Sequence, residues 1–524
     1  AKANALKAEV MVAQGNLVDA VPLLEGALKA DPSNAFAQGR LGRLHLRLND
    51  PDKAIGLFEK ASTSVPESLD YAEGLLSSLV AVGRMDDAQK VVDRVAPRFP
   101  GNAELLLLSA RVADAKDNSK LAEEGYKRAI AANDTLAEAY IRLARLYFRF
   151  RRFDEALPQL QAGLEKIPND ASLHVAMGEF ALEQRNFDVA AKELAQAIVL
   201  APTSAEANLG QSRVLLARDD VAKAAEYANK AVTLNPRIPG GRLQRGLVLW
   251  KAKRYDEALV ELEEAKKLEP GNRQVLVAIG AVSFEKGDFN TALASLNSVL
   301  IAEAAHPEAN FYLGRLKNAK SEHTQAIDAM KKALESNPKN PVFRYWMGRV
   351  LRDARKSAEA VTEWKTAIEI DPNYADALEA LGQLSLDQGA YKPAVNYFKR
   401  ALAASPNRAS AHVALGDASM QLEDWDTAIT SYQQAIGVDP QSKSTFYKLA
   451  RAYEEGKHGA KAVEWYRKAI AHEPNNAEAW LSLGWLYKDA RQKADATASF
   501  KRYLEIRPDA ENKKEIEDEI DFLK

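Results

Sequence analysis

Proline recurs along this chain with a period of 34 residues, and this spacing limits the fold more strongly than any other feature. Thirteen prolines share one register, namely Pro32, Pro66, Pro100, Pro168, Pro202, Pro236, Pro270, Pro338, Pro372, Pro406, Pro440, Pro474 and Pro508. This register divides residues 1–510 into fifteen repeats without an insertion or a deletion. Such a constant period is typical of solenoid proteins, in which each repeat buries its apolar face only by stacking on its neighbours.

Small residues occupy fixed positions within the repeats. When each repeat is numbered from 1 to 34, position 20 is alanine in all fifteen, position 8 is glycine in nine and position 27 is alanine in eleven. A helical glycine costs about 0.8–1 kcal/mol relative to alanine, so this column needs a compensating gain in packing. We therefore expect two helices to approach closely in each repeat. Repeat 3 (69–102) has Leu76 at position 8 and should pack abnormally.

Helix boundaries follow the same period. Position 34 carries a residue type that favours helix N-caps in nine repeats: Asn34, Ser68, Asn102, Asp170, Ser204, Asn272, Asn340, Ser442 and Asn476. The register proline ends the preceding helix. Glycine at position 15 indicates a turn in the middle of the repeat, as at Gly15, Gly83, Gly287 and Gly389. Each repeat is thus predicted to be a helix–turn–helix.

The last two repeats carry a recognisable pattern. In repeat 15 it consists of Trp480, Leu483, Gly484, Tyr487, Ala496, Phe500 and Pro508. In repeat 14 it consists of Phe446, Leu449, Ala450, Tyr453, Ala462, Tyr466, Ala469 and Pro474. The pattern resembles the tetratricopeptide repeat (TPR) family. The resemblance implies an all-α fold, a right-handed α-solenoid of about fifteen TPR repeats in one continuous array over residues 1–510, with the first helices lining a concave groove.

The two ends of the chain differ. Residues 511–524 lie outside the period and place Ile516, Ile520 and Leu523 on one helical face. This spacing predicts an amphipathic helix that caps the last repeat. The chain starts at Ala1, already in register and without methionine, so we expect processing or a cut at this point.

Repeats 10 (307–340) and 11 (341–374) concentrate aromatic and arginine residues at positions that line the groove in TPR proteins. These residues are Phe311, Tyr312, Arg315, Tyr345, Trp346, Arg349 and Arg352. Aromatic and arginine side chains dominate binding hot spots, and no carboxylate occupies positions 5, 6, 9 or 12 of these two repeats. We predict that they bind a peptide segment with acidic and apolar residues. Packing between repeats is an equally strong explanation for some of the rings.

A second basic group lies in repeat 5 (137–170), where Arg142, Arg145 and Arg149 share a helix face. It is compatible with an anionic ligand. Repeat 6 (171–204), however, places Glu179 and Glu183 at the positions that Arg145 and Arg149 occupy in repeat 5. We favour a ladder of ion pairs between the repeats over a ligand site.

Composition argues against several classes of function. Lys+Arg number 71 and Asp+Glu 73, so the basic excess expected of a nucleic-acid-binding protein is missing. The chain has no cysteine, and its seven histidines show no metal-ligand spacing. No phosphate-binding loop or nucleophile elbow occurs, and no apolar run is long enough to span a membrane. We expect no metal, no cofactor, no catalytic residue and no membrane span. Cytoplasm and periplasm fit equally well.

The function predicted from these observations is that of a non-catalytic scaffold or adaptor that binds protein partners. Alanine-rich repeats without insertions and a near-neutral charge resemble bacterial TPR proteins of cell-envelope assembly, motility or exopolysaccharide secretion. The alternative is a targeting or regulatory TPR module of a larger enzyme or of a secretion complex. A carbohydrate or nucleic-acid binder should show regularly spaced aromatic columns, and here the aromatic residues cluster in two repeats.

Overall fold

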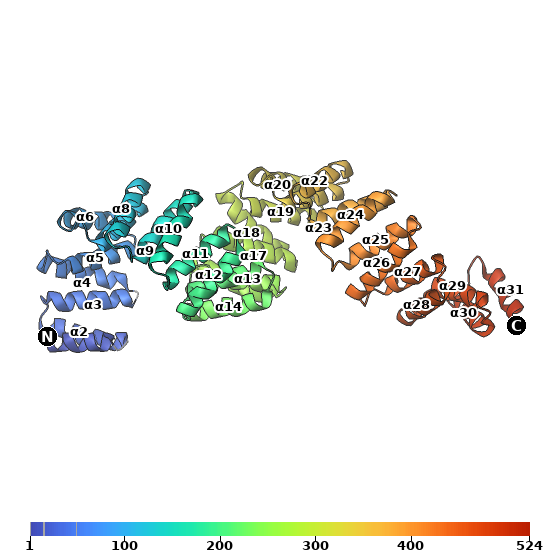
Figure 1. The fold of residues 1–524 in the computed structure, drawn as a ribbon, viewed down its shortest axis with the longest axis horizontal. Coiled ribbons are helices and arrows are strands. Elements are labelled where there is room, and N and C mark those ends of the chain that lie inside the picture. The colour runs from blue at the N-terminus through green and yellow to red at the C-terminus, as the bar shows by residue number, and fades with distance from the viewer. Residues whose placement is uncertain (1, 14–15, 49) are drawn as a thin grey trace. The chain divides into compact units, whose positions relative to one another are not determined.

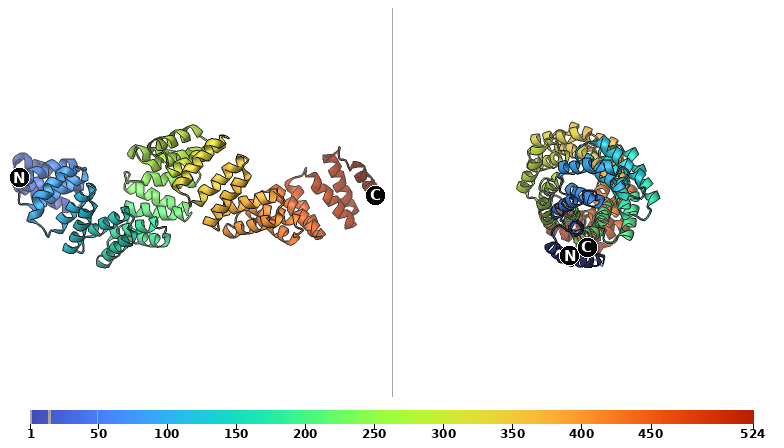
Figure 2. Two further views of the ribbon diagram at one scale, coloured as in Figure 1. Left: turned by 90° about the horizontal axis from the view of Figure 1, so that it is seen from above. Right: turned by 90° about the vertical axis from the view of Figure 1, so that its left-hand side faces the viewer.

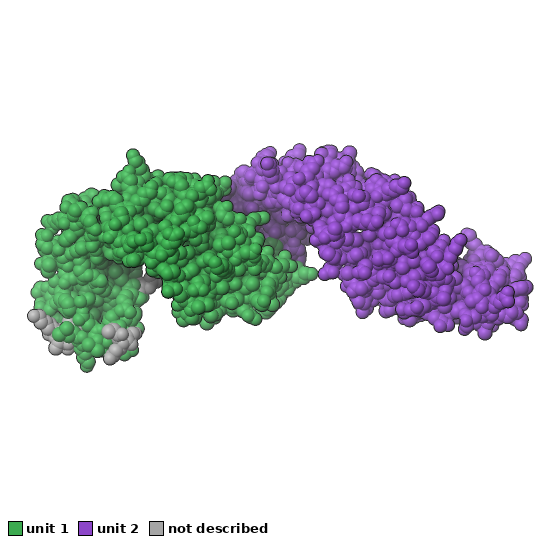
Figure 3. Space-filling model, viewed as in Figure 1, with its two compact units in different colours: residues 1–270 green, residues 271–524 purple. Residues whose placement is uncertain are grey.

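The computed structural model describes residues 2–13, 16–48 and 50–524, so the predicted turn at Gly15 lies outside the described residues. Within these ranges the chain forms 31 α-helices, one 3-10 helix and no strand. This confirms the prediction of an all-α fold made of helix–turn–helix repeats. The Cα positions separate into two compact units, residues 1–270 and 271–524 (Figure 3), and each is described by itself.

In both units the helices follow one another as antiparallel pairs, one pair per repeat (Figures 1 and 2). Unit 1 contains α1 (Lys2–Ala13), α2 (Leu17–Ala30), α3 (Ala35–Arg47), α4 (Pro51–Ser64), α5 (Leu69–Ala81), α6 (Met85–Val95), η1 (Ala96–Arg98), α7 (Ala103–Ala115), α8 (Ser119–Ala132), α9 (Ala137–Arg149), α10 (Phe153–Lys166), α11 (Ala171–Glu183), α12 (Phe187–Leu200), α13 (Ala205–Ala217), α14 (Val221–Leu234), α15 (Gly241–Lys251) and α16 (Tyr255–Leu268). Unit 2 contains α17 (Arg273–Lys286), α18 (Phe289–Ala302), α19 (Pro307–Ala319), α20 (His323–Ser336), α21 (Pro341–Asp353), α22 (Ser357–Ile370), α23 (Ala375–Asp387), α24 (Tyr391–Ala404), α25 (Ala409–Gln421), α26 (Trp425–Val438), α27 (Lys443–Glu455), α28 (Gly459–His472), α29 (Ala477–Asp489), α30 (Lys493–Ile506) and α31 (Lys513–Leu523).

Eight of the nine predicted N-caps are formed. In each, the side-chain oxygen at position 34 accepts a hydrogen bond from a backbone N–H in the first turn of the next repeat's first helix. The prediction was wrong for Ser442, which makes no such bond. Its hydroxyl lies 2.8 Å from the hydroxyl of Thr445 instead, because a side-chain partner is within reach there.

The turn at position 15 has one backbone conformation in every repeat where it is described. Gly83, Gly287 and Gly389 have positive φ angles, as their residue type suggests. Ten non-glycine residues at the same position also have positive φ, namely Asp117, Arg151, Arg185, Asp219, Lys253, Ser321, Arg355, Glu423, Lys457 and Arg491. A left-handed backbone costs an L-residue about 1–2 kcal/mol. The packing of the two helices therefore sets this turn, whatever residue occupies it.

The position 8 glycines explain how closely the helices approach. A Cβ added at each of the nine would meet the side chain at position 24 of the same repeat, with nearest distances of 2.3–2.9 Å. These side chains are Phe58, Leu194, Leu262, Leu296, Met330, Trp364, Phe398, Tyr432 and Phe500. Each glycine thus makes room for a large residue on the partner helix.

Repeat 3 shows the irregularity expected from Leu76. Leu76 is fully buried, and the facing position 24 holds the smaller Val92 in the same core cluster. Its second helix, α6, ends at Val95 and is followed by the 3-10 helix that contains Pro97. In this repeat the larger residue is at position 8 and the smaller at position 24, and α6, the helix that carries Val92, is shortened to 11 residues.

Two surfaces result from the stacking within each unit. First helices of consecutive repeats contact one another, for example α9 with α11 and α19 with α21, whereas no consecutive second helices in the described chain make comparable contacts. We call the surface formed by the first helices of consecutive repeats the first-helix face, and the surface formed by the second helices the second-helix face. At the last repeat, α31 packs on α30 and buries Ile516, Ile520 and Leu523, as their spacing predicts.

Candidate functional site

Two of the seven residues predicted to bind a partner in repeats 10 and 11 are enclosed by the protein itself. Phe311 is 5% exposed and stacks on Phe343, with 4.7 Å between ring centroids. The side chain of Arg315 is 13% exposed and pairs with Glu285 of α17 at 2.8 Å. The carboxylate that is missing from repeats 10 and 11 is thus supplied by repeat 9, and Arg315 serves packing between repeats.

The rings around Arg315 hold it in place. Its guanidinium lies 4.2 Å from the ring centroid of Trp346 and 4.8 Å from that of Phe284. Tyr312, on the same helix, is largely withdrawn from solvent, and burial raises the pKa of its hydroxyl to about 12. Arg315 and Phe311, whose ring centroid lies 6.4 Å from that of Trp346, therefore support the position of Trp346.

The side chains that remain accessible lie on α21. Tyr345 and Trp346 are partly exposed and contact each other edge to face at 5.9 Å. The Arg349 guanidinium lies 4.5 Å from the ring centroid of Trp346, and in the described chain Arg349 makes no ion pair. Arg352 is exposed and pairs with the adjacent Asp353 at 3.0 Å. We call these four residues, Tyr345, Trp346, Arg349 and Arg352, the α21 cluster.

The second basic group, on α9, is neutralised within the chain. Arg142 pairs with Glu138 at 3.2 Å, and Arg145 pairs with Glu179 at 3.1 Å. The second of these pairs is the one that the ladder predicts. The prediction was wrong for Arg149, which pairs with Asp114 of repeat 4 and not with Glu183 of repeat 6. Carboxylates flank α9 on both sides in the stack, and the long Arg149 side chain reaches back to the earlier one.

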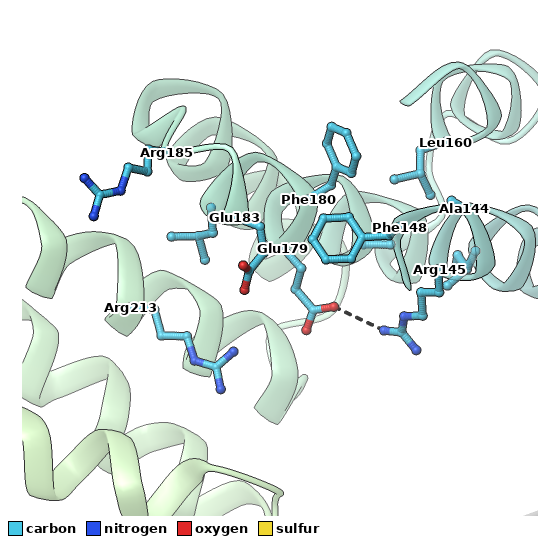
Figure 4. Close-up of a pocket in the computed structure, with 12 residues that line it drawn as sticks. Ala144, Arg145, Phe148, Leu160, Glu179, Phe180, Glu183, Arg185 and Arg213 are labelled. Carbon is cyan, nitrogen blue, oxygen red and sulfur yellow. Dashed lines mark hydrogen bonds and ion pairs between the residues drawn. The ribbon is translucent and has the colours of Figure 1, made fainter. Parts of the chain in front are cut away.

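An open hollow of about 530 Å³ lies beside this group on the first-helix face, lined by residues of α9, α10, α11 and α13 (Figure 4). Phe148 and Phe180 meet there edge to face at 5.9 Å, next to the pair of Arg145 and Glu179. Arg213 approaches from α13. Sequence reasoning missed this hollow, although aromatic residues at positions 12 and 10 of neighbouring repeats were a signal for it.

The charge network behind α9 predicts a dependence of stability on pH. Glu123 accepts hydrogen bonds from Arg152 at 2.7 Å, Lys127 at 2.7 Å and Tyr147 at 3.0 Å. The bond from Arg152 is the largest cause that lowers the pKa of Glu123 from 4.5 to about 2. Because the folded state binds this proton more weakly than the unfolded state, the network stabilises the fold above pH 4.5. That stability is lost as the pH falls towards 2.

Thermal unfolding of the wild type and of Glu123→Gln between pH 7 and pH 2 tests this prediction. We expect the variant to be less stable at neutral pH and the difference to shrink as the pH falls from about 4.5 to about 2. Glu124→Gln is the control, because Glu124 is the exposed neighbour on the same helix. A constant difference between wild type and Glu123→Gln across this range would contradict the prediction.

Two other kinds of feature, metal-binding clusters and membrane-spanning helices, are not found among the described residues of the chain. No group of three or more His, Cys, Asp or Glu side chains among them is arranged to hold a metal ion. None of the helices described is both long and apolar enough to cross a bilayer.

Comparison with known families defines the class of protein to which this array of helix pairs belongs. Models described as tetratricopeptide repeat match residues 11–79, 141–205, 175–241, 209–273, 277–341, 375–408 and 465–498, and models described as TPR repeat match 348–389 and 416–456. These matches extend over most of the chain, so the class is that of helical repeat proteins. The chain belongs to the tetratricopeptide repeat family. Membership supports a general role as a protein-interaction scaffold, and the TPR fold is typically non-catalytic.

Individual relatives match only in part. Interferon-induced protein with tetratricopeptide repeats 2 of Homo sapiens is 30% identical over 147 residues, which are 26% of this chain and 30% of that protein. Cellulose synthase operon protein C of Pseudomonas fluorescens is 25% identical over 163 residues, 30% of this chain and 13% of that protein. The chain thus spans less than a third of the length of these curated relatives. Among solved structures, MamA is 27% identical over 31% of this chain and 95% of its own, with a TM-score of 0.30.

Proposed function

We propose that this chain is a non-catalytic scaffold that holds peptide segments of protein partners against the first-helix face of repeats 10 and 11. The observation that carries the proposal is Arg349. It is the guanidinium of this face that stacks on a partly exposed tryptophan and has no carboxylate partner in the described chain. A charged group held in this way is available to a carboxylate from another molecule.

The α21 cluster suits a peptide that combines an acidic with an apolar side chain. Arg349 offers several N–H donors that a carboxylate can engage in pairs. Tyr345 and Trp346 provide rigid apolar area next to it, and desolvation by the bound peptide would strengthen the ion pair. Arg315 supports this surface from within, because Glu285 already neutralises its charge.

Binding measurements with variants test the proposal. The probe is an array of synthetic peptides of about 15 residues, long enough to cross one or two repeats, in which acidic and apolar content is varied. We expect the wild-type chain to select peptides with both features. Arg349→Ala should weaken the binding of these peptides by about tenfold, which corresponds to the loss of one charge-assisted hydrogen bond. Lys365→Ala is the matched control, because Lys365 is an exposed cation on the second helix of the same repeat. Binding unchanged by the Trp346→Ala, Arg349→Ala double change would refute the proposal.

A second candidate function is the TPR portion of a larger protein of exopolysaccharide secretion. The match to Cellulose synthase operon protein C, which covers only 13% of that protein, favours this candidate. The intact mass of the native product distinguishes the two. A product much longer than 524 residues supports the second candidate, and a product of this length excludes it.

A further inference from the structure

A larger hollow lies on the second-helix face of unit 1, between α10 and α12 and above α11. Its volume is about 1010 Å³, and it uses none of the residues of the α21 cluster. The three helices that form it follow one another in Figure 1. Apolar side chains line it, namely Phe153, Leu157, Leu164, Met177, Phe180 and Val189. We call this hollow the α10–α12 groove.

Much of this apolar lining remains accessible to solvent. Val189 is 36% exposed, and Phe153, Leu157 and Leu164 are only partly buried. Phe180 lines both this groove and the hollow on the first-helix face, so its ring is the partition between them. A contiguous accessible apolar surface with a polar rim marks an interaction site in soluble proteins.

The rim of the groove carries unbalanced negative charge on the α10 side. Asp154 near the start of α10 and Glu165 near its end are exposed, and neither makes an ion pair in the described chain. Pro158 has no N–H, so the carbonyl of Asp154 lacks the helical hydrogen bond that this position would otherwise donate. The first turn of α10 therefore presents a carboxylate and a carbonyl oxygen as acceptors.

The α12 side of the rim is neutral by comparison. Lys192 lies 3.7 Å from Glu193, and the other carboxylate oxygen of Glu193 lies 2.7 Å from Nδ1 of His174. A partner that complements these charges therefore places basic groups above α10 and none above α12. A purely apolar partner would leave Asp154 and Glu165 without a counter-charge.

From this arrangement we infer that the α10–α12 groove binds an amphipathic helix of a partner protein, with a Lys or Arg near each end of the bound segment. The partner's apolar stripe lies on Leu157, Phe180 and Val189, and its two cations meet Asp154 and Glu165. These two acids are eleven positions apart in α10, which is about 16 Å at 1.5 Å per residue. The cations of a partner helix that runs along α10 are therefore spaced by about eleven residues.

Site-directed cross-linking locates the bound helix. The chain has no cysteine, so Val189→Cys places a single thiol in the groove of the full chain. Val199→Cys is the matched control, because Val199 lies on the same helix, is 72% exposed and is not part of the groove. The probe is a synthetic helical peptide of about 18 residues, with leucines spaced at i, i+4, i+7 and i+11, two lysines about eleven residues apart and one activated thiol.

We expect Val189→Cys to form the mixed disulfide about tenfold faster than Val199→Cys in native buffer, and both to react alike in concentrated urea. The greater exposure of Val199 works against this result, so a faster reaction at residue 189 reports binding. Equal rates in native buffer would overturn the inference. So would dimerisation of the chain through residue 189 without peptide, because a second copy would then fill the groove.

Charge reversal tests the kind of partner. By fluorescence anisotropy, we expect the Asp154→Lys, Glu165→Lys double variant to bind the lysine peptide about tenfold more weakly. A peptide in which glutamates replace the lysines should bind more tightly to this double variant than to the wild type. The control reverses Glu124 and Glu226, which are exposed acids elsewhere in unit 1. Undiminished binding of the lysine peptide by the double variant would overturn the inference. Arg349→Ala should leave this binding unchanged, so failure here is separate from failure of the α21 proposal.

Discussion

Replacing Gly348 by alanine is expected to destabilise repeat 11 by about 2 kcal/mol, although alanine is the better helix former. The added Cβ would lie 2.3 Å from Nε1 of Trp364, a side chain that is 1% exposed. Trp364 cannot withdraw freely, because its indole N–H donates to the carbonyl of Tyr345 at 3.0 Å. Overpacking costs about 1–3 kcal/mol, and straining the hydrogen bond costs about 1 kcal/mol. The better helix propensity of alanine offsets up to about 1 kcal/mol of this loss.

Two other glycines provide the comparison. Gly314→Ala should cost less, because the facing residue is Met330, whose flexible chain adapts to a new neighbour. Gly56→Ala should stabilise by up to about 1 kcal/mol, since no atom lies within 4 Å of a Cβ at this helical position. Hydrogen exchange of α21 and α22 measures the effect locally, which suits a protein in which each repeat contacts only its neighbours. Adding Trp364→Met to Gly348→Ala should recover part of the loss. Unchanged exchange in Gly348→Ala would show that positions 8 and 24 are not matched in size.

Replacing Glu261 by alanine is expected to cost about 3 kcal/mol in unit 1. The Glu261 side chain is 10% exposed and forms ion pairs with Arg242 at 2.9 Å and with Arg245 at 3.2 Å. Its removal leaves two guanidiniums close together without a carboxylate. Breaking a buried pair costs about 3–5 kcal/mol, and we take the lower end because both arginines are about a quarter exposed.

A matched control lies one turn earlier on the same helix. Glu257 pairs with Arg254, and both side chains are 57% exposed. Solvent screens such a surface pair, so Glu257→Ala should leave stability unchanged. Urea unfolding, together with hydrogen exchange of α15 and α16, compares the two variants. If Glu261→Ala were no more harmful than Glu257→Ala, the buried pair would contribute nothing to the stack.

The proposed function assigns stability and binding to different arginines. Arg315 and Arg349 occupy the same position in consecutive repeats, yet Glu285 neutralises only Arg315. A scan that replaces both with alanine should therefore change stability at Arg315 and binding at Arg349.

The period, the helix pairs and most of the N-caps followed from local sequence signals. An N-cap such as Asn34 needs only the backbone of the next turn, and a glycine such as Gly348 needs only a large residue sixteen positions later, so both can be read along one repeat. The apolar spacing of Ile516, Ile520 and Leu523 predicts the last helix for the same reason.

Packing between repeats decided the rest. Arg149 forms its ion pair with Asp114 and not with Glu183, and Arg315 forms its ion pair with Glu285 of the preceding repeat. Long side chains on a stacked helix can reach carboxylates in either neighbouring repeat, and their relative distances depend on how the repeats stack. The backbone of Arg151 was likewise set by its two helices and not by its own preference. Spacing along the chain predicts which residues share a face, whereas the stacking of the repeats decides which of these residues form ion pairs within the described chain.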